Sequence, residues 1–239
     1  MNPVTIEVFH AGECPVVEKI CLVLHKVVSS SELEAVIRIT EVVNGDEACA
    51  GVLPGVPLIR IGGEDASGAA GCCSLSLPAF SDDFVPSHDL LRHGIAKAAG
   101  LRTVLFVCTG NAVRSQMAEG IVNRFLRGKW AAFSGGVIPM EIPEDVVKVM
   151  YEIGVDISSC RPKHVDTFKG LHFDRVVLLC SDASRMCPGL PDYEEREYIF
   201  FRDPFSSLVF FEGVCFSLRS TFRGLRDDIR KKLMKYLEG

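Results

Sequence analysis

The chain has 239 residues, of which 48% are hydrophobic and 24% charged. This length suffices for one large domain or two ordinary domains, each with a buried core. The formal net charge is −5, and no cluster of Lys and Arg stands apart from acidic neighbours, which argues against a nucleic-acid or anionic-membrane surface. No segment reaches the roughly 20 apolar residues that span a bilayer, and the first residues lack the pattern of a secretion signal. We therefore expect a cytoplasmic protein with no nucleic-acid and no membrane partner.

The chain contains ten cysteines and six histidines. The cysteines are scattered rather than paired in C-x-x-C units, which disfavours a zinc framework or a secreted disulfide scaffold. The histidines show no ligand spacing, so we expect no catalytic metal. Some cysteines should then be redox or catalytic thiols, whereas others fill the core. Those without a partner motif are interpreted as core or incidental thiols: Cys21, Cys49, Cys160 and Cys215.

The first part of the chain begins with a β-α-β pattern. Apolar residues at spacings of three and four predict a helix that follows the first strand. A later strand is entered through Pro57 and left through a Gly-Gly turn, and a second helix follows. The segment 65–83, rich in Gly, Ala and Ser around Cys72 and Cys73, receives no assignment. The predicted elements are strands 5–9, 35–43 and 55–65 and helices 15–28 and 86–99.

A domain boundary is predicted at Gly100, because glycine suits the position just after a helix and a new apolar strand begins at Thr103. The two domains are therefore 1–99 and 100–239. In the second domain, near-continuous apolar strands alternate with helices, which is typical of a parallel sheet covered on both faces. Its predicted elements are strands 103–108, 130–136, 175–180 and 197–201 and helices 115–126, 143–153 and 218–237.

A cysteine ends the first of these strands, in the stretch VLFVCTGNAVRSQMAEG at residues 104–120. Cys108 is followed by a glycine-containing loop, by Arg114 six positions later, and by a helical pattern. Backbone N–H groups of such a loop, with the positive end of the helix dipole, bind anions and stabilise a thiolate. Arg114 can bind two oxygens of a tetrahedral oxyanion. The motif predicts a nucleophilic Cys108 facing an oxyanion; the alternative is a buried structural cysteine beside a surface arginine.

The stretch CTGNAVRSQMAEG resembles the low-molecular-weight tyrosine phosphatase superfamily, and looks most like its thioredoxin-coupled arsenate reductase branch. The resemblance covers about residues 102–238 and implies an α/β domain with a flavodoxin-like, four-stranded parallel sheet flanked by helices. Val113 departs from the reductases, which often carry a second, non-essential cysteine there. The resemblance also implies which residues bind the oxyanion: Thr109, Gly110, Asn111, Ala112, Val113, Arg114 and Ser115.

Both branches of the superfamily need a general acid for the leaving oxygen, and the resemblance places it in an Asp-Pro pair. Asp203 in the stretch FRDPF precedes Pro204 and is the candidate. This residue does not separate a reductase from a phosphatase. An ordinary turn or cap aspartate is the alternative interpretation.

A second pair of cysteines does separate the two chemistries. Cys180 and Cys187 lie seven residues apart, a spacing that completes the cycle in the arsenate reductases and that the phosphatases do not need. In an ideal helix their Cα atoms would lie about 10.5 Å apart, whereas a disulfide needs roughly 4.4 to 6.8 Å. We therefore expect this segment to be looped or to unwind, and to differ between reduced and oxidised forms. The alternative is two core thiols at a strand end.

The resemblance implies a three-cysteine relay for arsenate reduction. Cys108 attacks arsenate with assistance from Arg114 and Asp203, Cys180 then attacks Cys108 as two electrons pass to arsenic, and Cys187 resolves the resulting disulfide. Thioredoxin would act as the external reductant, and no cofactor would be tightly bound. Phosphate and sulfate would be competing oxyanions.

Some reductases of this type also bind a potassium ion near the loop. Oxygen ligands are common everywhere, so ordinary loop and helix positions are an equally good interpretation. The residues of this sequence that match the potassium positions are Asn111, Glu119, Ser134 and Asp166.

Residues 1–99 resemble a smaller thioredoxin-like α/β domain. The stretch TIEVFHAGECP would supply the first strand and the active-site turn, and Pro57 the position where that fold usually has a cis-proline. The second cysteine of a C-x-x-C site would fall at Val17 and is absent, so this domain is not a standard disulfide reductase. Cys14 could form a mixed disulfide or pair with Cys72 or Cys73; a docking or structural domain is the alternative.

Three functions follow from these patterns. The leading one is an arsenate reductase. The second is a phosphatase acting on phosphotyrosine or a small phosphoester, in which Cys180 and Cys187 would be idle. The third is a redox-sensing or partner-binding module that uses its disulfide as a switch. The physiological reductant, the oligomeric state and the role of the first domain are left unassigned by the sequence.

Overall fold

The computed structural model divides into two compact units, Met1–Leu101 and Arg102–Gly239. Within the described residues, no helix is long and apolar enough to cross a lipid bilayer. The described residues are 3–10, 15–31, 34–42, 57–62, 64–65, 74–75, 86–187, 189–206 and 218–239. Several features singled out in the sequence lie outside them: Cys14, Cys49, Cys72, Cys73, Cys215 and the peptide bond before Pro57.

The first unit contains a sheet of mixed strand direction in the order β2-β1-β3-β4, with β5 also pairing with β3. Strands β1 and β2 are parallel and are joined by α1, which confirms the predicted β-α-β opening. Strand β3 is antiparallel to β1, β4 and β5. The bounds are β1 Val4–His10, α1 Pro15–Ser31, β2 Ala35–Glu41, β3 Leu58–Ile61, β4 Glu64–Asp65, β5 Ser74–Leu75 and α2 His88–Ala98.

The core of the first unit lies between this sheet and its two helices. Ile20 and Leu24 of α1 are fully buried, as are Ile6 of β1 and Leu91 and Ile95 of α2. The 3–4 spacing of these helical residues places them on one face, which explains why the pattern predicted the helices correctly.

The second unit is built on a four-stranded sheet in the order β7-β6-β8-β9. All three pairings in the sheet are parallel, which confirms the predicted four-stranded parallel sheet. Because the central strand β6 is buried on both faces, its residues form the continuous apolar run seen in the sequence. The bounds are β6 Arg102–Cys108, β7 Trp130–Gly136, β8 His172–Leu178 and β9 Asp192–Tyr198.

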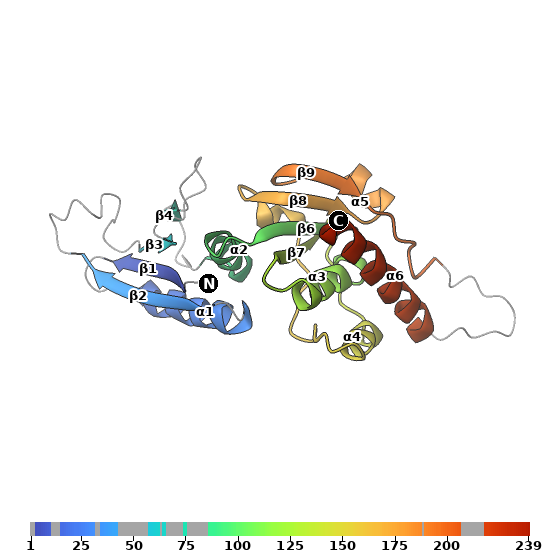
Figure 1. The fold of residues 1–239 in the computed structure, drawn as a ribbon, viewed down its shortest axis with the longest axis horizontal. Coiled ribbons are helices and arrows are strands. Elements are labelled where there is room, and N and C mark those ends of the chain that lie inside the picture. The colour runs from blue at the N-terminus through green and yellow to red at the C-terminus, as the bar shows by residue number, and fades with distance from the viewer. Residues whose placement is uncertain are drawn as a thin grey trace, which may run out of the picture. The chain divides into compact units, whose positions relative to one another are not determined.

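Helices α3, α4 and α6 lie together beside this sheet in Figure 1. Helix α3 packs on β6 and β7, α6 packs along α3, and α4 packs against α6. On the opposite face, the rings of Phe133, Phe173 and Phe168 meet edge to face, with Phe168 contributed by the short 3₁₀ helix η2. The sheet is therefore covered on both faces. The bounds are α3 Arg114–Phe125, α4 Glu144–Tyr151, η2 Val165–Phe168, α5 Ser181–Met186 and α6 Leu218–Glu238.

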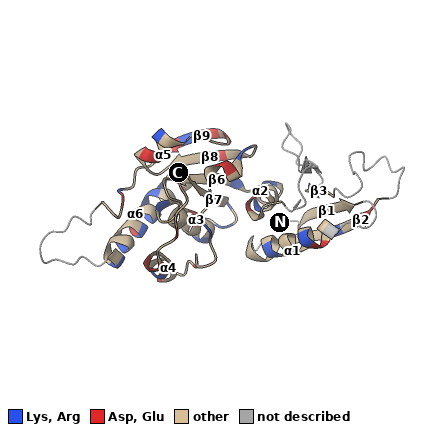
Figure 2. Ribbon diagram, turned by 180° about the vertical axis from the view of Figure 1, so that it is seen from behind, with Lys and Arg blue, Asp and Glu red and all other residues tan. Residues whose placement is uncertain are grey.

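Ion pairs join α6 to α4 and the turn after it. Basic residues recur along α6 (Figure 2), and Arg223 binds both carboxylate oxygens of Glu152 while Arg226 donates to the same carboxylate at 3.1 Å. The hydrogen bonds from Arg223, more than its charge, lower the pKa of Glu152 to about 2. These contacts fix the position of the last helix on the unit.

Two sequence assignments in this unit are wrong. The last strand is the polar stretch 192–198 rather than 197–201, because β9 is an edge strand whose side chains are mostly exposed. The apolar residues after it leave the sheet, and Phe201 buries its ring at 1% exposure. Strand β8 also ends at Leu178, so Cys180 lies beyond it as the N-cap of α5, a helix that the sequence did not predict.

Candidate active site

The candidate nucleophile lies where strand β6 ends and helix α3 begins. Cys108 is the last residue of β6, and Arg114 is the first residue of α3, so residues 109–113 form the connecting loop. Cys108 is 2% exposed, Arg114 8% and Ser115 0%. The predicted motif therefore has its predicted context of strand, loop and helix, at the edge of the sheet where parallel α/β folds bind ligands.

The backbone of this loop is arranged to receive an anion. Within the described residues, none of the N–H groups of Gly110, Asn111, Ala112 and Val113 donates to a protein acceptor. These groups precede the N-terminus of α3, where the helix dipole favours negative charge. The Cys108 sulfur also lies 3.0 Å from the Ser115 hydroxyl oxygen. The loop, the helix and the hydroxyl can together stabilise a thiolate and a bound oxyanion.

Asn111 holds the loop in shape from inside. It is fully buried and adopts a φ of 45°, a left-handed conformation in which asparagine is one of the tolerated residues. Its Nδ2 donates to the hydroxyls of Ser115 at 2.9 Å and Ser134 at 2.8 Å. Its Oδ1 accepts from Gln116 Nε2 at 3.1 Å and from the Lys163 backbone N–H at 2.8 Å. The side chain thus ties the loop to α3, to β7 and to the segment after α4.

Gly136, at the end of β7, lies directly beneath the loop. A Cβ atom built there would lie 2.7 Å from the Asn111 backbone nitrogen and 2.9 Å from the Thr109 carbonyl oxygen. The Thr109 carbonyl also accepts from the N–H groups of Val137 and Ile138, each at 2.9 Å. The loop therefore rests on a position that admits glycine alone.

Arg114 and Asp203 lie together at the loop. Arg114 Nη2 is 3.6 Å from Asp203 Oδ2, and Arg114 Nη1 is 3.5 Å from the Phe201 carbonyl oxygen. The Asp203 side chain is 46% exposed, and its Oδ1 accepts from the Phe205 N–H at 2.8 Å. The structure brings the predicted acid to the predicted arginine, but the same carboxylate also closes a turn. The acid role of Asp203 stays a prediction.

The other two predicted relay cysteines flank α5. Cys180 is 2% exposed, and its sulfur lies 3.3 Å from the hydroxyl of Thr109, the residue after Cys108. Cys187 follows α5, and its thiol donates to the Gly189 carbonyl oxygen at 3.4 Å. Cys108, Cys180 and Cys187 are all free thiols. The thiol of Cys180 thus lies beside the loop of residues 109–113, here called the oxyanion loop, and the thiol of Cys187 lies at the other end of α5.

A cavity of about 280 Å³ lies between α5 and the strands β8 and β9. Cys187 lines it together with the guanidinium-bearing Arg196. The other lining residues are Leu178, Ala183, Ser184, Leu190 and Tyr193. The cavity leaves space on the inner side of α5, next to the thiol of Cys187.

The side chains matched to a potassium site form hydrogen bonds and ion pairs with other protein groups. Ser134 donates to Glu119 Oε2 at 2.5 Å, and the ammonium of Lys163 is 3.8 Å from the same oxygen. Asp166 instead pairs with His164 and Lys169. The described residues contain no group of three or more His, Cys, Asp or Glu side chains placed to hold a metal ion. Asn111, Ser134 and Glu119 are thus already hydrogen-bonded to one another and face an ammonium, whereas Asp166 keeps one buried oxygen without a partner among the described residues.

Sequence reasoning missed three residues that build the site. Gly136 supports the loop, and Gln116, which is 1% exposed, donates to Asn111. Lys163 places its ammonium near Glu119, behind the loop. Only the pair of glycines at the end of the strand WAAFSGG gave a signal, since glycine in a strand marks a close backbone approach. The other two contacts join residues that no local pattern relates.

Comparison with known proteins identifies the family of the second unit. The curated arsenate reductase of Halalkalibacterium halodurans is 36% identical over 137 residues, which are 57% of this chain and 96% of that protein. Arsenate reductase 2 of Staphylococcus epidermidis is 40% identical over 103 residues, covering 43% of this chain and 79% of that protein. A solved arsenate reductase in the phosphate binding state is 26% identical, with a TM-score of 0.48 over 58% of this chain and 98% of that chain. A model of low molecular weight phosphotyrosine protein phosphatases matches residues 103–236, and the chain belongs to this family.

Proposed function

We propose that this protein is an arsenate reductase that uses Cys108, Cys180 and Cys187 as a thiol relay. The observation that most supports this proposal is the 3.3 Å contact between Cys180 Sγ and Thr109 Oγ1, which brings a second buried thiol to the loop of the nucleophile. Hydrolysis of a phosphoester needs no such thiol, whereas two-electron reduction of an oxyanion bound to Cys108 needs a second thiol that forms a disulfide with Cys108. The arsenate reductases to which the second unit is 34–40% identical support the same choice.

The first step is an attack by the Cys108 thiolate on arsenic. A sulfur–arsenic bond forms and an arsenic–oxygen bond breaks, and Asp203 donates the proton that lets the oxygen leave as water. Arg114 and the free N–H groups of the loop bind the remaining oxygens, where negative charge develops. Ser115 donates to the sulfur while it is a thiolate.

The second step moves two electrons to arsenic. Cys180 attacks Cys108 Sγ, a disulfide forms, and the electron pair of the sulfur–arsenic bond stays on arsenic, which leaves as arsenite. Cys187 then attacks Cys180 Sγ and releases the Cys108 thiolate. The Cys180–Cys187 disulfide is reduced by an external dithiol, for which we propose thioredoxin, with no tightly bound cofactor.

Closing the Cys180–Cys187 bond requires α5 to unwind. Cys180 is the N-cap of α5 and Cys187 its C-cap, so the helix separates the two residues. The two Cα atoms would be about 10.5 Å apart in an ideal helix, against roughly 4.4 to 6.8 Å in a disulfide. The cavity beside Cys187 gives the side chains of the segment space to rearrange. The proposed relay therefore includes a change of α5 between reduced and oxidised forms.

For residues 1–99 we propose a thioredoxin-like fold. A parallel pair β1/β2 joined by α1, with β3 antiparallel to β1 and followed by α2, supports this assignment. We propose that this domain docks the reductant or exchanges a thiol with it. A cytoplasmic location would keep the relay thiols reduced between turnovers.

Hydrolysis of an aryl phosphate is the second candidate function. Met140 is 59% exposed, and its sulfur would lie 3.3 Å from a Cβ on Gly110, so an apolar side chain covers part of the loop. Phe205, two residues after Asp203, is 45% exposed. Such side chains suit an aromatic leaving group better than a bare oxyanion.

A paired assay tests the proposal. The full chain is assayed for arsenate-dependent NADPH oxidation with thioredoxin and thioredoxin reductase, beside hydrolysis of a chromogenic aryl phosphate. The Cys187→Ser variant should release about one arsenite per chain and then stall, because nothing resolves the Cys108–Cys180 disulfide. Cys160→Ser is the matched control and should turn over like the wild type. Sustained turnover by Cys187→Ser, or aryl phosphate hydrolysis without arsenate reduction, would contradict the relay.

A further inference from the structure

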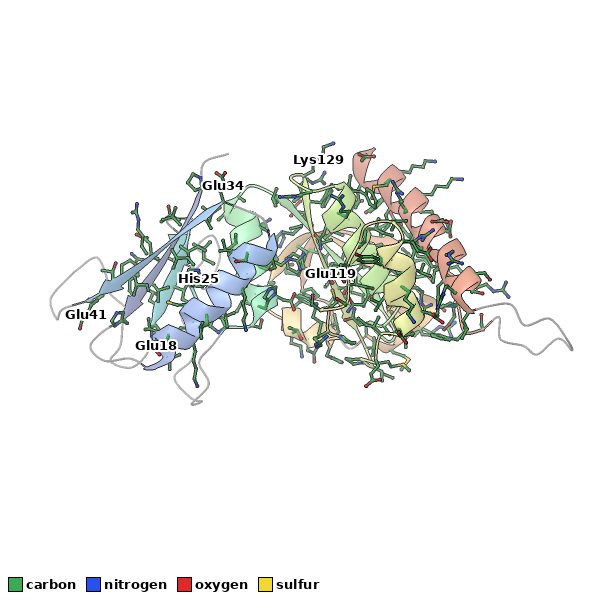
Figure 3. All side chains as sticks on the ribbon, turned by 90° about the horizontal axis from the view of Figure 1, so that it is seen from below. Glu18, His25, Glu34, Glu41, Glu119 and Lys129 are labelled. Atoms are coloured by element: carbon green, nitrogen blue, oxygen red, sulfur yellow. The ribbon has the colours of Figure 1, made fainter. Side chains whose placement is uncertain are left out.

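A pair of opposite charges lies behind the oxyanion loop, largely out of water. The side chains of Glu119 and Lys163 are 9% and 18% exposed, and Lys163 Nζ is 3.8 Å from Glu119 Oε2. Glu119, labelled in Figure 3, lies within the second unit, where its carboxylate also accepts from the Ser134 hydroxyl. A carboxylate in such a place is costly unless a cation and hydrogen bonds compensate it.

Two chains of contacts run from this pair to the oxyanion loop. Ser134 accepts from Asn111 Nδ2 at 2.8 Å, so Glu119 reaches the loop through a hydroxyl. The backbone N–H of Lys163 donates to Asn111 Oδ1 at 2.8 Å, so the segment that carries the ammonium also reaches it. Asn111 is the loop residue with the left-handed backbone. The charge pair and the loop shape are therefore coupled at one residue.

We propose that the ammonium of Lys163 is the built-in counter-ion of Glu119 and takes the place that the family resemblance gives to potassium. Lys163 is then a positioning residue that keeps the loop in its anion-binding shape without a bound metal ion. The inference rests on the geometry behind the loop and holds for either substrate class, arsenate or a phosphoester.

A potassium ion is the alternative to Lys163 as the counter-ion of Glu119, and the experiment has to distinguish the two. Gln116 Oε1 and Asp166 Oδ1 are buried acceptors with no hydrogen-bond partner in the described part of the chain. A potassium ion needs several such oxygens. The side-chain oxygen of Asn111 already accepts from two N–H groups, and its side-chain nitrogen donates to Ser134, so Asn111 presents no unused oxygen to an ion. The ammonium of Lys163 already faces the carboxylate of Glu119 at 3.8 Å.

Thermal unfolding of the full chain in potassium chloride and in choline chloride, at equal ionic strength, tests the proposal. The wild type should have the same melting temperature in both salts to within about 1 °C, because at equal ionic strength and with a common anion we expect only a specifically bound cation to separate the two salts. Lys163→Met should melt about 5 °C lower in choline chloride, since it removes the ammonium that faces the buried Glu119 carboxylate. Potassium chloride should restore at least half of that loss. Lys148→Met removes an exposed ion pair with Glu144 and should show neither effect.

Binding of inorganic phosphate, measured by calorimetry in the same salts, gives the second readout. Lys163→Met should bind phosphate about tenfold more weakly in choline chloride and recover in potassium chloride, as expected if the cation positions the loop. Where Lys163→Met does not fold, the Lys163→Met/Glu119→Gln double variant, which removes both charges, should fold. A potassium-specific rise in the wild-type melting temperature, a Lys163→Met effect that potassium does not rescue, or failure of the double variant to fold would each overturn the proposal.

Discussion

The oxyanion loop and helix α5 carry different parts of the proposed relay, and they are built differently. The loop residue Asn111 and Ser115 of α3 are fully buried and hydrogen-bonded to each other, and Gly136 supports the loop from below. Helix α5 has six residues, of which Ala183 is buried, and a cavity lies on its inner side. A nucleophile benefits from fixed geometry, whereas a thiol that must change partners needs a chain that can move.

The largest predicted effect concerns the acid at the loop. Asp203→Asn keeps an oxygen that can accept from the Phe205 N–H, but it removes the proton that the leaving oxygen needs. We expect kcat for arsenate reduction to fall about 10³-fold with an unchanged melting temperature. Steady-state kinetics and thermal unfolding measure both. An unchanged kcat would leave Asp203 with only its turn role.

The second prediction compares two variants, one with a methyl group added under the loop and one with a methyl group added beside α5. In Gly136→Ala the new Cβ would lie 2.7 Å from the Asn111 nitrogen, whereas in Gly189→Ala nothing lies within 4 Å. We expect kcat/KM to fall about 10²-fold in Gly136→Ala, since small displacements of reacting groups are costly. Gly189→Ala should stay near the wild-type value. Equal losses in the two variants would remove the distinction between a fixed loop and an adaptable α5.

Hydrogen exchange gives a smaller effect on the same comparison. The amides of α5 should exchange at least about tenfold faster in one redox form than in the other, because the Cys180–Cys187 bond requires the helix to open. The amides of α3, which follow the loop, should exchange alike in both forms. Mass spectrometry of the reduced and the thioredoxin-free oxidised chain measures this. Equal protection of α5 in the two forms contradicts the required unwinding.

The smallest effect lies outside both regions, at the contact of α6 with Glu152. The pKa of Glu152 is lowered to about 2 by the hydrogen bonds from Arg223, so the folded state holds this carboxylate ionised. Its contribution to stability is present above the ordinary pKa of 4.5 and is lost as the pH falls toward 2. Glu152→Gln should therefore lower stability slightly at pH 7 and not at pH 2. Denaturant titrations at both pH values check this, and an equal loss at both would exclude a charge effect.

The sequence predicted the loop better than it predicted α5, and the reason is local. Strand β6, the loop and α3 are consecutive, and an apolar run followed by glycine and a helical period describes all three. Strand β9 has no such pattern because it is an edge strand with exposed charged side chains, and α5 is too short to show a period. The apolar residues after β9 suggested a strand, although Phe201 is buried outside it.

The residues of the site were likewise predictable only where a local sequence pattern contains them. Cys108 and Arg114 could be paired from their spacing, and the resemblance then added Cys180, Cys187 and Asp203. The link from Lys163 to Asn111 joins residues 52 positions apart, and the link from Ser134 to Asn111 joins residues 23 apart. Such contacts depend on the fold of the whole unit, so no pattern in a single sequence reports them.

Identifying the disulfides formed during turnover tests the relay most directly. The Cys187→Ser variant is mixed with one equivalent of arsenate, quenched with acid, alkylated and digested, and its disulfide-linked peptides are identified by mass spectrometry. The relay predicts a Cys108–Cys180 bond in this variant and a Cys180–Cys187 bond in the wild type. Arsenite formation with Cys180 fully alkylated would contradict it.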